Sequence, residues 1–75
     1  MNFMVWLADQ LDGLGRVPRF SKLVFDDINN GCGSSRFGPT QWKDHFEKEH
    51  EESSDELIYL LTVAYSNYVL DRSGR

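Results

Sequence analysis

The chain has 75 residues and a formal net charge of −4. A chain of this length buries only about 60% of the surface of its unfolded form, so it can build one hydrophobic core and a second domain is excluded. The acidic balance disfavours a protein whose main task is to hold nucleic-acid phosphates, although it leaves nucleic acid open as a partner.

The cysteine content and the lengths of the apolar segments further limit the class of protein to which the chain can belong. The single cysteine, Cys32, excludes an internal disulfide and fits a reducing compartment. No apolar run, 57–61 included, approaches the roughly 20 residues of a membrane helix. Residues 1–4 contain no basic segment of the kind that opens a signal peptide. We therefore expect a cytoplasmic protein without a membrane partner.

The first predicted helix spans about Asn2 to Leu14. Its apolar residues recur at spacings of three, four and seven, which place them on one face of a helix: Phe3, Trp6, Leu7, Leu11 and Leu14. Gly13 and Gly15 are expected to end this helix, because glycine adopts the left-handed conformation without a side-chain penalty.

The second predicted helix begins near Pro18. Proline suits the first turn of a helix, because the amide proton that it lacks would have no partner there. Phe20, Leu23 and Ile28 define the apolar positions of this helix. The turn-forming residues that follow predict a flexible loop over about 29–38.

The third and fourth predicted helices complete the chain. A short helix is expected after Thr40, whose hydroxyl can cap free amides, and it should bury Trp42 and Phe46. The fourth helix has the strongest start signal, because Ser53 and Glu56 have the spacing of a capping box. It is expected to run to Leu70 or so, followed by a frayed tail over 71–75.

These elements predict an all-α fold, a compact bundle of four to five short helices in a single domain over residues 1–75. The pattern shows neither strand alternation nor an internal repeat. One core is expected, with these members: Trp6, Leu7, Leu23, Phe46, Leu57, Leu61, Ala64 and Tyr68.

Three short patterns lie within the predicted helices. The chain opens with Phe-x-x-Trp-Leu-x-x-Gln, at Phe3, Trp6, Leu7 and Gln10. The segment 17–27 is a hydrophobic helix with a trailing acid, at Leu23 and at Asp26 or Asp27. The last helix contains an Ala-aromatic-x-x-Tyr pattern, at Ala64, Tyr65 and Tyr68.

In these positions the chain resembles the YozE SAM-like family, small bacterial domains with a sterile-alpha-motif-like helical bundle. It departs from the family by its glycine-serine loop and by Tyr65, where the family more often has tryptophan. The resemblance implies a SAM-like fold. It implies no activity, because the family has no established chemistry, and a function has to be argued from a site.

The residues with metal-binding or nucleophilic side chains do not form a recognisable catalytic or metal motif. His45, His50, Glu49 and Cys32 include enough ligand atoms for zinc, but a structural zinc site normally takes four ligands, often with paired cysteines. We interpret both histidines as surface residues among solvating acids. No base lies near Cys32 in the sequence, so a nucleophilic role is not expected either. We expect no catalytic residues, no metal, no cofactor and no small-molecule substrate.

Three surfaces are candidates for binding. In the last helix, Tyr59, Val63 and Leu70 form a second apolar stripe roughly opposite the core face, which indicates either a helix buried on all sides or a contact with another chain. A basic trio recurs every three residues: Arg16, Arg19 and Lys22. An acidic set is expected on one helix face, where it could imitate a row of phosphates: Asp44, Glu47 and Glu51.

From these surfaces we expect a non-catalytic protein-interaction module that acts by self-association or by docking on a larger protein through the stripe. Two alternatives stay open. One is an inhibitor from a phage or mobile element, similar to anti-CRISPR proteins, that uses the acidic set. The other is a weak nucleic-acid-binding domain that uses the basic trio.

Overall fold

The computed structural model describes residues 2–73, which form four α-helices and one short 3-10 helix without any strand. The elements are α1 (Phe3–Asp9), α2 (Arg16–Asn29), α3 (Pro39–Glu49), η1 (Glu51–Ser53) and α4 (Ser54–Ser73). The predicted all-α bundle is therefore confirmed. Within residues 2–73, none of the helices combines the length and the apolar content that a membrane crossing requires.

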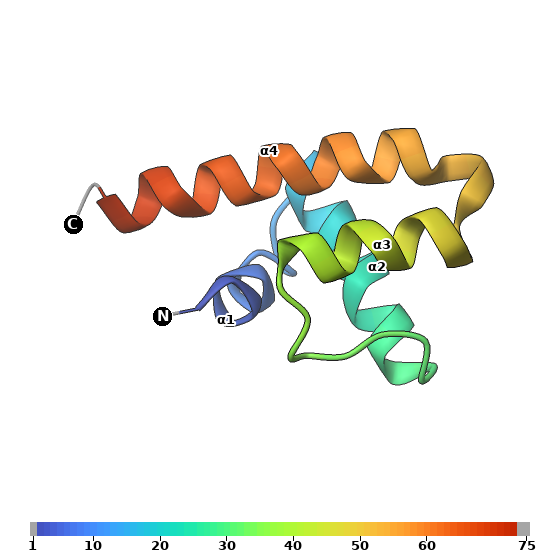
Figure 1. Ribbon diagram of the computed structural model, residues 1–75. Coiled ribbons are helices and arrows are strands. Elements are labelled where there is room, and N and C mark those ends of the chain that lie inside the picture. Colours follow the sequence, from blue (N-terminus) through green and yellow to red (C-terminus); the bar gives the residue numbers. More distant parts are fainter. Residues whose placement is uncertain (1, 74–75) are drawn as a thin grey trace.

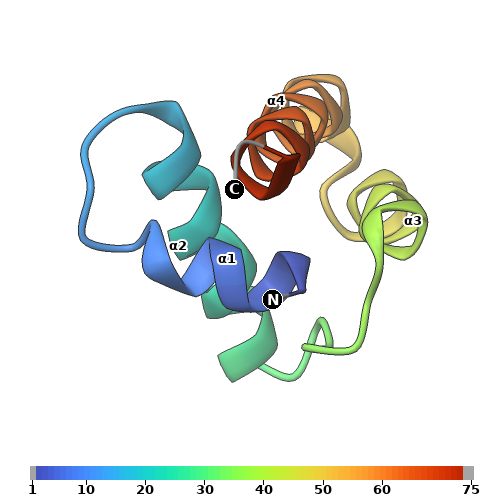
Figure 2. The ribbon, with the colours of Figure 1, turned by 90° about the vertical axis from the view of Figure 1, so that its left-hand side faces the viewer.

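The longest helix, α4, contacts each of the other three α-helices. Figure 1 shows α4 running across the whole molecule, with α3 beside its first half and α1 near its C-terminal end. In Figure 2, which looks along α4, α1 and α2 lie on one side of it and α3 on the other. A small core thus forms where the four helices meet.

The first helix is much shorter than predicted. Asn2 caps α1 through its side chain, which accepts a hydrogen bond from the amide of Val5 at 2.9 Å. The helix ends at Asp9, and the amides of Gln10 and Leu11 instead bond to carbonyls three residues back, in a tightening turn. Leu14 is 99% exposed, because nothing packs on this part of the predicted apolar face. The expectation of a helix to Leu14 was therefore wrong.

The starts of the other helices also differ in detail from the predictions. Gly15, with φ of +112°, is the N-cap of α2, so Pro18 is the third helical residue, still within the turn whose amides lack helical partners. The N-cap of α3 is Gly38 and not Thr40, and the side chain of Gln41 accepts a hydrogen bond from the Gly38 amide at 2.8 Å.

The end of α4 corrects the predicted tail. Residues 71–73 continue the helix, whereas 74–75 lie outside the described residues. The indole Nε1 of Trp6 donates a hydrogen bond to Oδ2 of Asp71 at 3.0 Å, and the guanidinium of Arg72 lies over the ring of Tyr68 at 5.6 Å. These contacts stabilise the last turn, which the charged sequence alone had suggested would fray.

The core contains most of the predicted residues. Leu23 is the exception, since it is only partly buried. Further buried hydrophobic residues join the core from the first three helices, and of these Trp42 was predicted to be buried: Phe3, Met4, Phe20, Val24 and Trp42. Aromatic rings make many of the contacts, such as the edge-to-face pair of Phe20 and Phe46, with centroids 5.8 Å apart.

Candidate functional site

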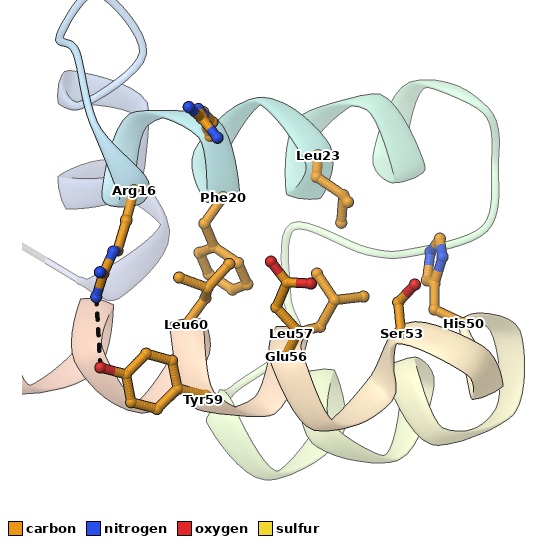
Figure 3. A pocket seen from close by; sticks show the side chains of 10 residues that line it. Arg16, Phe20, Leu23, His50, Ser53, Glu56, Leu57, Tyr59 and Leu60 are labelled. Atoms are coloured by element: carbon orange, nitrogen blue, oxygen red, sulfur yellow. Dashed lines mark hydrogen bonds between the residues drawn. The ribbon is translucent and has the colours of Figure 1, made fainter.

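A groove with a volume of about 640 Å³ lies between α2 and α4. Figure 3 shows its side chains projecting from the two helices and, at His50 and Ser53, from the segment that connects α3 to α4. Its apolar part consists of Phe20, Leu23, Leu57 and Leu60. Leu23 and Leu60 are only partly buried, so the groove keeps apolar surface in contact with solvent. This explains why Leu23 is not a full member of the core.

The two ends of the groove differ in charge. Arg16 and Arg19, both exposed, lie at the end formed by the start of α2. The guanidinium of Arg16 donates a long hydrogen bond of 3.5 Å to the hydroxyl of Tyr59, which connects the two helices across the groove (Figure 3). Residues of the other half are His50, Ser53 and Glu56. The groove is therefore cationic at one end and carries a carboxylate further along.

The predicted apolar stripe of α4 is only partly exposed. Tyr59 is 55% exposed and Leu70 is 70% exposed, whereas Val63 between them is partly buried. Tyr59 lines the groove, while Val63 and Leu70 are not among its lining residues. The helix is thus not buried on all sides, and the stripe meets the groove at Tyr59.

The fold separates one member of the predicted basic trio from the other two, and likewise one member of the predicted acidic set. Arg16 and Arg19 line the groove, whereas Lys22 is exposed on α2 outside it. Asp44 and Glu47 are exposed on α3, but α3 ends at Glu49, so Glu51 belongs to η1. The three acidic residues therefore do not share one helix face, contrary to the prediction.

At the edge of the groove, Asp27, His45 and the groove residue His50 meet in a cluster that the sequence patterns did not reveal. Oδ2 of Asp27 lies 2.9 Å from Nε2 of His45 and 2.8 Å from Nε2 of His50. Asp27 and His45 are buried, so the interpretation of His45 as a surface residue was wrong. Glu49 and Cys32, which had been considered with the histidines, are exposed and do not belong to the cluster.

The shape of the chain after α3 explains why sequence spacing missed this cluster. Residues five apart do not face each other on a straight helix. The helix ends at Glu49, however, and His50 adopts φ of −127° and ψ of 48°, which turns the chain out of the helix. One sequence signal was present, because Asp27 follows Phe20 and Val24 on the buried face of α2, and a buried carboxylate requires a partner.

Aromatic rings hold His45 in place. The ring of Trp42 packs perpendicular to that of His45, with centroids 5.3 Å apart, and Phe46 lies 5.8 Å from it. His50 contacts the ring of Phe46 at 6.0 Å. The imidazoles are thus oriented by packing, and both present Nε2 to the same carboxylate oxygen.

Comparison of the chain with protein-family models, with curated proteins and with solved structures finds no match.

Proposed function

We propose that the chain is a non-catalytic protein-interaction module whose groove between α2 and α4 receives an acidic, amphipathic segment of a partner protein. The observation that carries the proposal is an apolar groove with two exposed arginines at one end. Binding of an amphipathic segment in such a groove is a recurrent mode of peptide recognition.

The apolar part of the groove provides the driving force. Leu23 and Leu60 remain partly accessible after the chain has folded, and Tyr59 projects at the rim. Apolar side chains of a partner would remove this surface from water, which stabilises the complex in proportion to the buried area. Tyrosine is also enriched among the residues that dominate binding energies at interfaces.

The arginines define the charge of the partner. A guanidinium binds a carboxylate through paired hydrogen bonds, with better geometry than lysine. Arg16 uses one donor for Tyr59 and retains others, and Arg19 lies beside it in the groove. Carboxylates near one end of the bound segment would therefore face these two side chains.

The same groove fits a nucleic acid less well. Affinity for phosphates comes from clustered cations, yet Lys22 lies outside the groove and Glu56 lies in it. The apolar side chains would also have no duplex surface to contact. These features favour a protein partner over the nucleic-acid alternative.

A comparison of two peptide pools tests the proposal. Both pools contain amphipathic peptides with leucine and phenylalanine on one face, and the other face carries aspartate and glutamate in one pool and lysine in the other. We expect the acidic pool to bind and to shift the amide NMR signals of residues along the groove. Added salt should weaken binding, because exposed charges are screened.

Charge reversal at Arg19 provides the decisive variant. Arg19→Glu should weaken binding of the acidic pool by at least about tenfold, since like charges that face each other at an interface are costly. Lys43→Glu, the same charge change on an exposed residue of α3, is the matched control and should bind as the wild type does. Equal binding of both pools, or an unchanged affinity in Arg19→Glu, would contradict the proposal. Binding of single-stranded DNA that depends on Arg19 would favour the nucleic-acid function instead.

A further inference from the structure

The ligand atoms of Asp27, His45 and His50 all lie within 4.8 Å of one another. Bonds of about 2.0–2.2 Å from a tetrahedral zinc ion place its ligand atoms about 3.4 Å apart. The distances of 2.8 and 2.9 Å from Oδ2 of Asp27 to the two Nε2 atoms are shorter than this by roughly half an ångström. Small side-chain rotations would therefore make room for an ion at the centre of the cluster.

The donor atoms indicate which kind of ion fits. Two imidazole nitrogens and one carboxylate oxygen suit zinc and related transition metals. Calcium and magnesium prefer oxygen ligands, of which only the carboxylate is available in this cluster. The side chain of His50 is 29% exposed, against 6% for His45, so solvent reaches the cluster from the His50 side. A water molecule can enter there as the fourth ligand.

The position of Asp27 in α2 also favours a cation. Asp27 lies in the last turn of α2. This turn contains no basic residue, and the side chain of Asp27 is only 12% exposed. The helix dipole places partial negative charge at this end of α2, so a buried carboxylate there is destabilised unless positive charge lies close by. A divalent ion held by Asp27 would supply that charge.

We propose that Asp27, His45 and His50 form a binding site for a divalent transition-metal ion of the zinc class, a function beyond the partner binding of the groove, which His50 also lines. In the metal-bound form, each imidazole is neutral, its Nε2 lone pair faces the ion and its proton is on Nδ1. In the metal-free form, Nε2–H groups donate hydrogen bonds to Asp27 instead. Metal binding thus changes the histidine tautomers, which nitrogen NMR detects directly.

Titration of the metal-free protein with zinc chloride tests the site. After dialysis against a chelator, we expect calorimetry to show one zinc ion bound per chain and thermal unfolding to shift to higher temperature, because the ion binds the native state. The Nε2 signals of both histidines should shift in the folded wild type. Absence of binding heat together with an unchanged melting temperature would overturn the proposal.

Variants then locate the ion. His50→Gln, at the most exposed ligand, and Asp27→Asn should each weaken zinc binding by at least about tenfold, since even outer-shell changes cost that much. Glu49→Gln and Cys32→Ser remove exposed donors close in sequence to the cluster and should bind zinc as the wild type does. If Asp27→Asn does not fold, the zinc affinity of His50→Gln and the NMR signals of the wild type still test whether the ion binds at this cluster. Wild-type affinity in His50→Gln, or its loss in Cys32→Ser or Glu49→Gln, would place the ion elsewhere and refute the site.

Discussion

At the scale of single residues, Asp27 connects three parts of the chain. Its carboxylate accepts hydrogen bonds from His45, in α3, and from His50, the residue that follows α3. Its backbone carbonyl accepts hydrogen bonds from the amides of Cys32 and Gly33, at 2.8 and 3.2 Å. One residue near the end of α2 therefore positions both the loop that follows and the helix beyond it.

Gly33 occupies a position where a side chain does not fit. A Cβ atom built there would lie 2.6 Å from Cη2 of Trp42, whose side chain is fully buried and packed against Phe37, His45 and Phe46. The loop after α2 thus packs directly on the core. Its glycine content reflects this close approach as well as the turn.

We expect Gly33→Ala to destabilise the protein by about 1–3 kcal/mol, the usual range for overpacking a core. Urea unfolding followed by circular dichroism measures the change. Ser35→Ala, at an exposed position of the same loop, is the control and should be neutral within about 0.5 kcal/mol. Equal stability of Gly33→Ala and the wild type would show that the loop does not lie against Trp42.

At the scale of elements, the sequence predicted the number, type and order of the helices because apolar spacing and turn residues are local signals. It predicted the ends less well. The apolar spacing from Phe3 to Leu14 continues past Asp9, but only tertiary contacts decide which part of it is buried. Conversely, the last turn of α4 persists through contacts to Trp6, some 65 residues away, which no local pattern reveals.

For the candidate sites too, the sequence predicted the local features but not the contacts between helices. Tyr59, Arg16 and Arg19 were identified from helical spacing, but their meeting in one groove depends on how α2 and α4 pack. The cluster around Asp27 was missed because its members come from different helices and because α3 stops one residue before His50.

The exposed end of the α4 stripe provides a test at this scale. Leu70→Lys should change the free energy of unfolding by no more than about 0.5 kcal/mol, because Leu70 is 70% exposed. Leu61→Lys, nine residues earlier on the buried face, should leave the chain unfolded, since an unpaired charge in a core is very costly. Thermal scans by circular dichroism compare the two. A loss of folding in Leu70→Lys would mean that the stripe belongs to the core.

At the scale of the whole molecule, the N-terminal helix depends on the C-terminal one. With seven residues, α1 is too short to persist alone, because isolated helices below about 12–15 residues are marginal in water. Its attachment is aromatic: Trp6 packs edge-to-face on Tyr68 at 6.0 Å, and Phe3 does so on Tyr68 at 5.5 Å. The two ends of the chain therefore close the core together.

Removal of the Trp6 ring should disrupt the packing of α1 on α4. Trp6→Ala is expected to cost about 3–5 kcal/mol, which equals the net stability that a core of this size supplies, so most molecules should be unfolded at room temperature. Trp6→Phe keeps a ring against Tyr68 but loses the hydrogen bond to Asp71 and part of the buried indole surface, so it should unfold cooperatively at a lower temperature than the wild type. Far-ultraviolet circular dichroism during heating measures both, and fluorescence of Trp42 reports separately on the core around α3. If Trp6→Ala melts cooperatively within a few degrees of the wild type, α1 contributes little to the fold and the bundle of α2, α3 and α4 is stable without it.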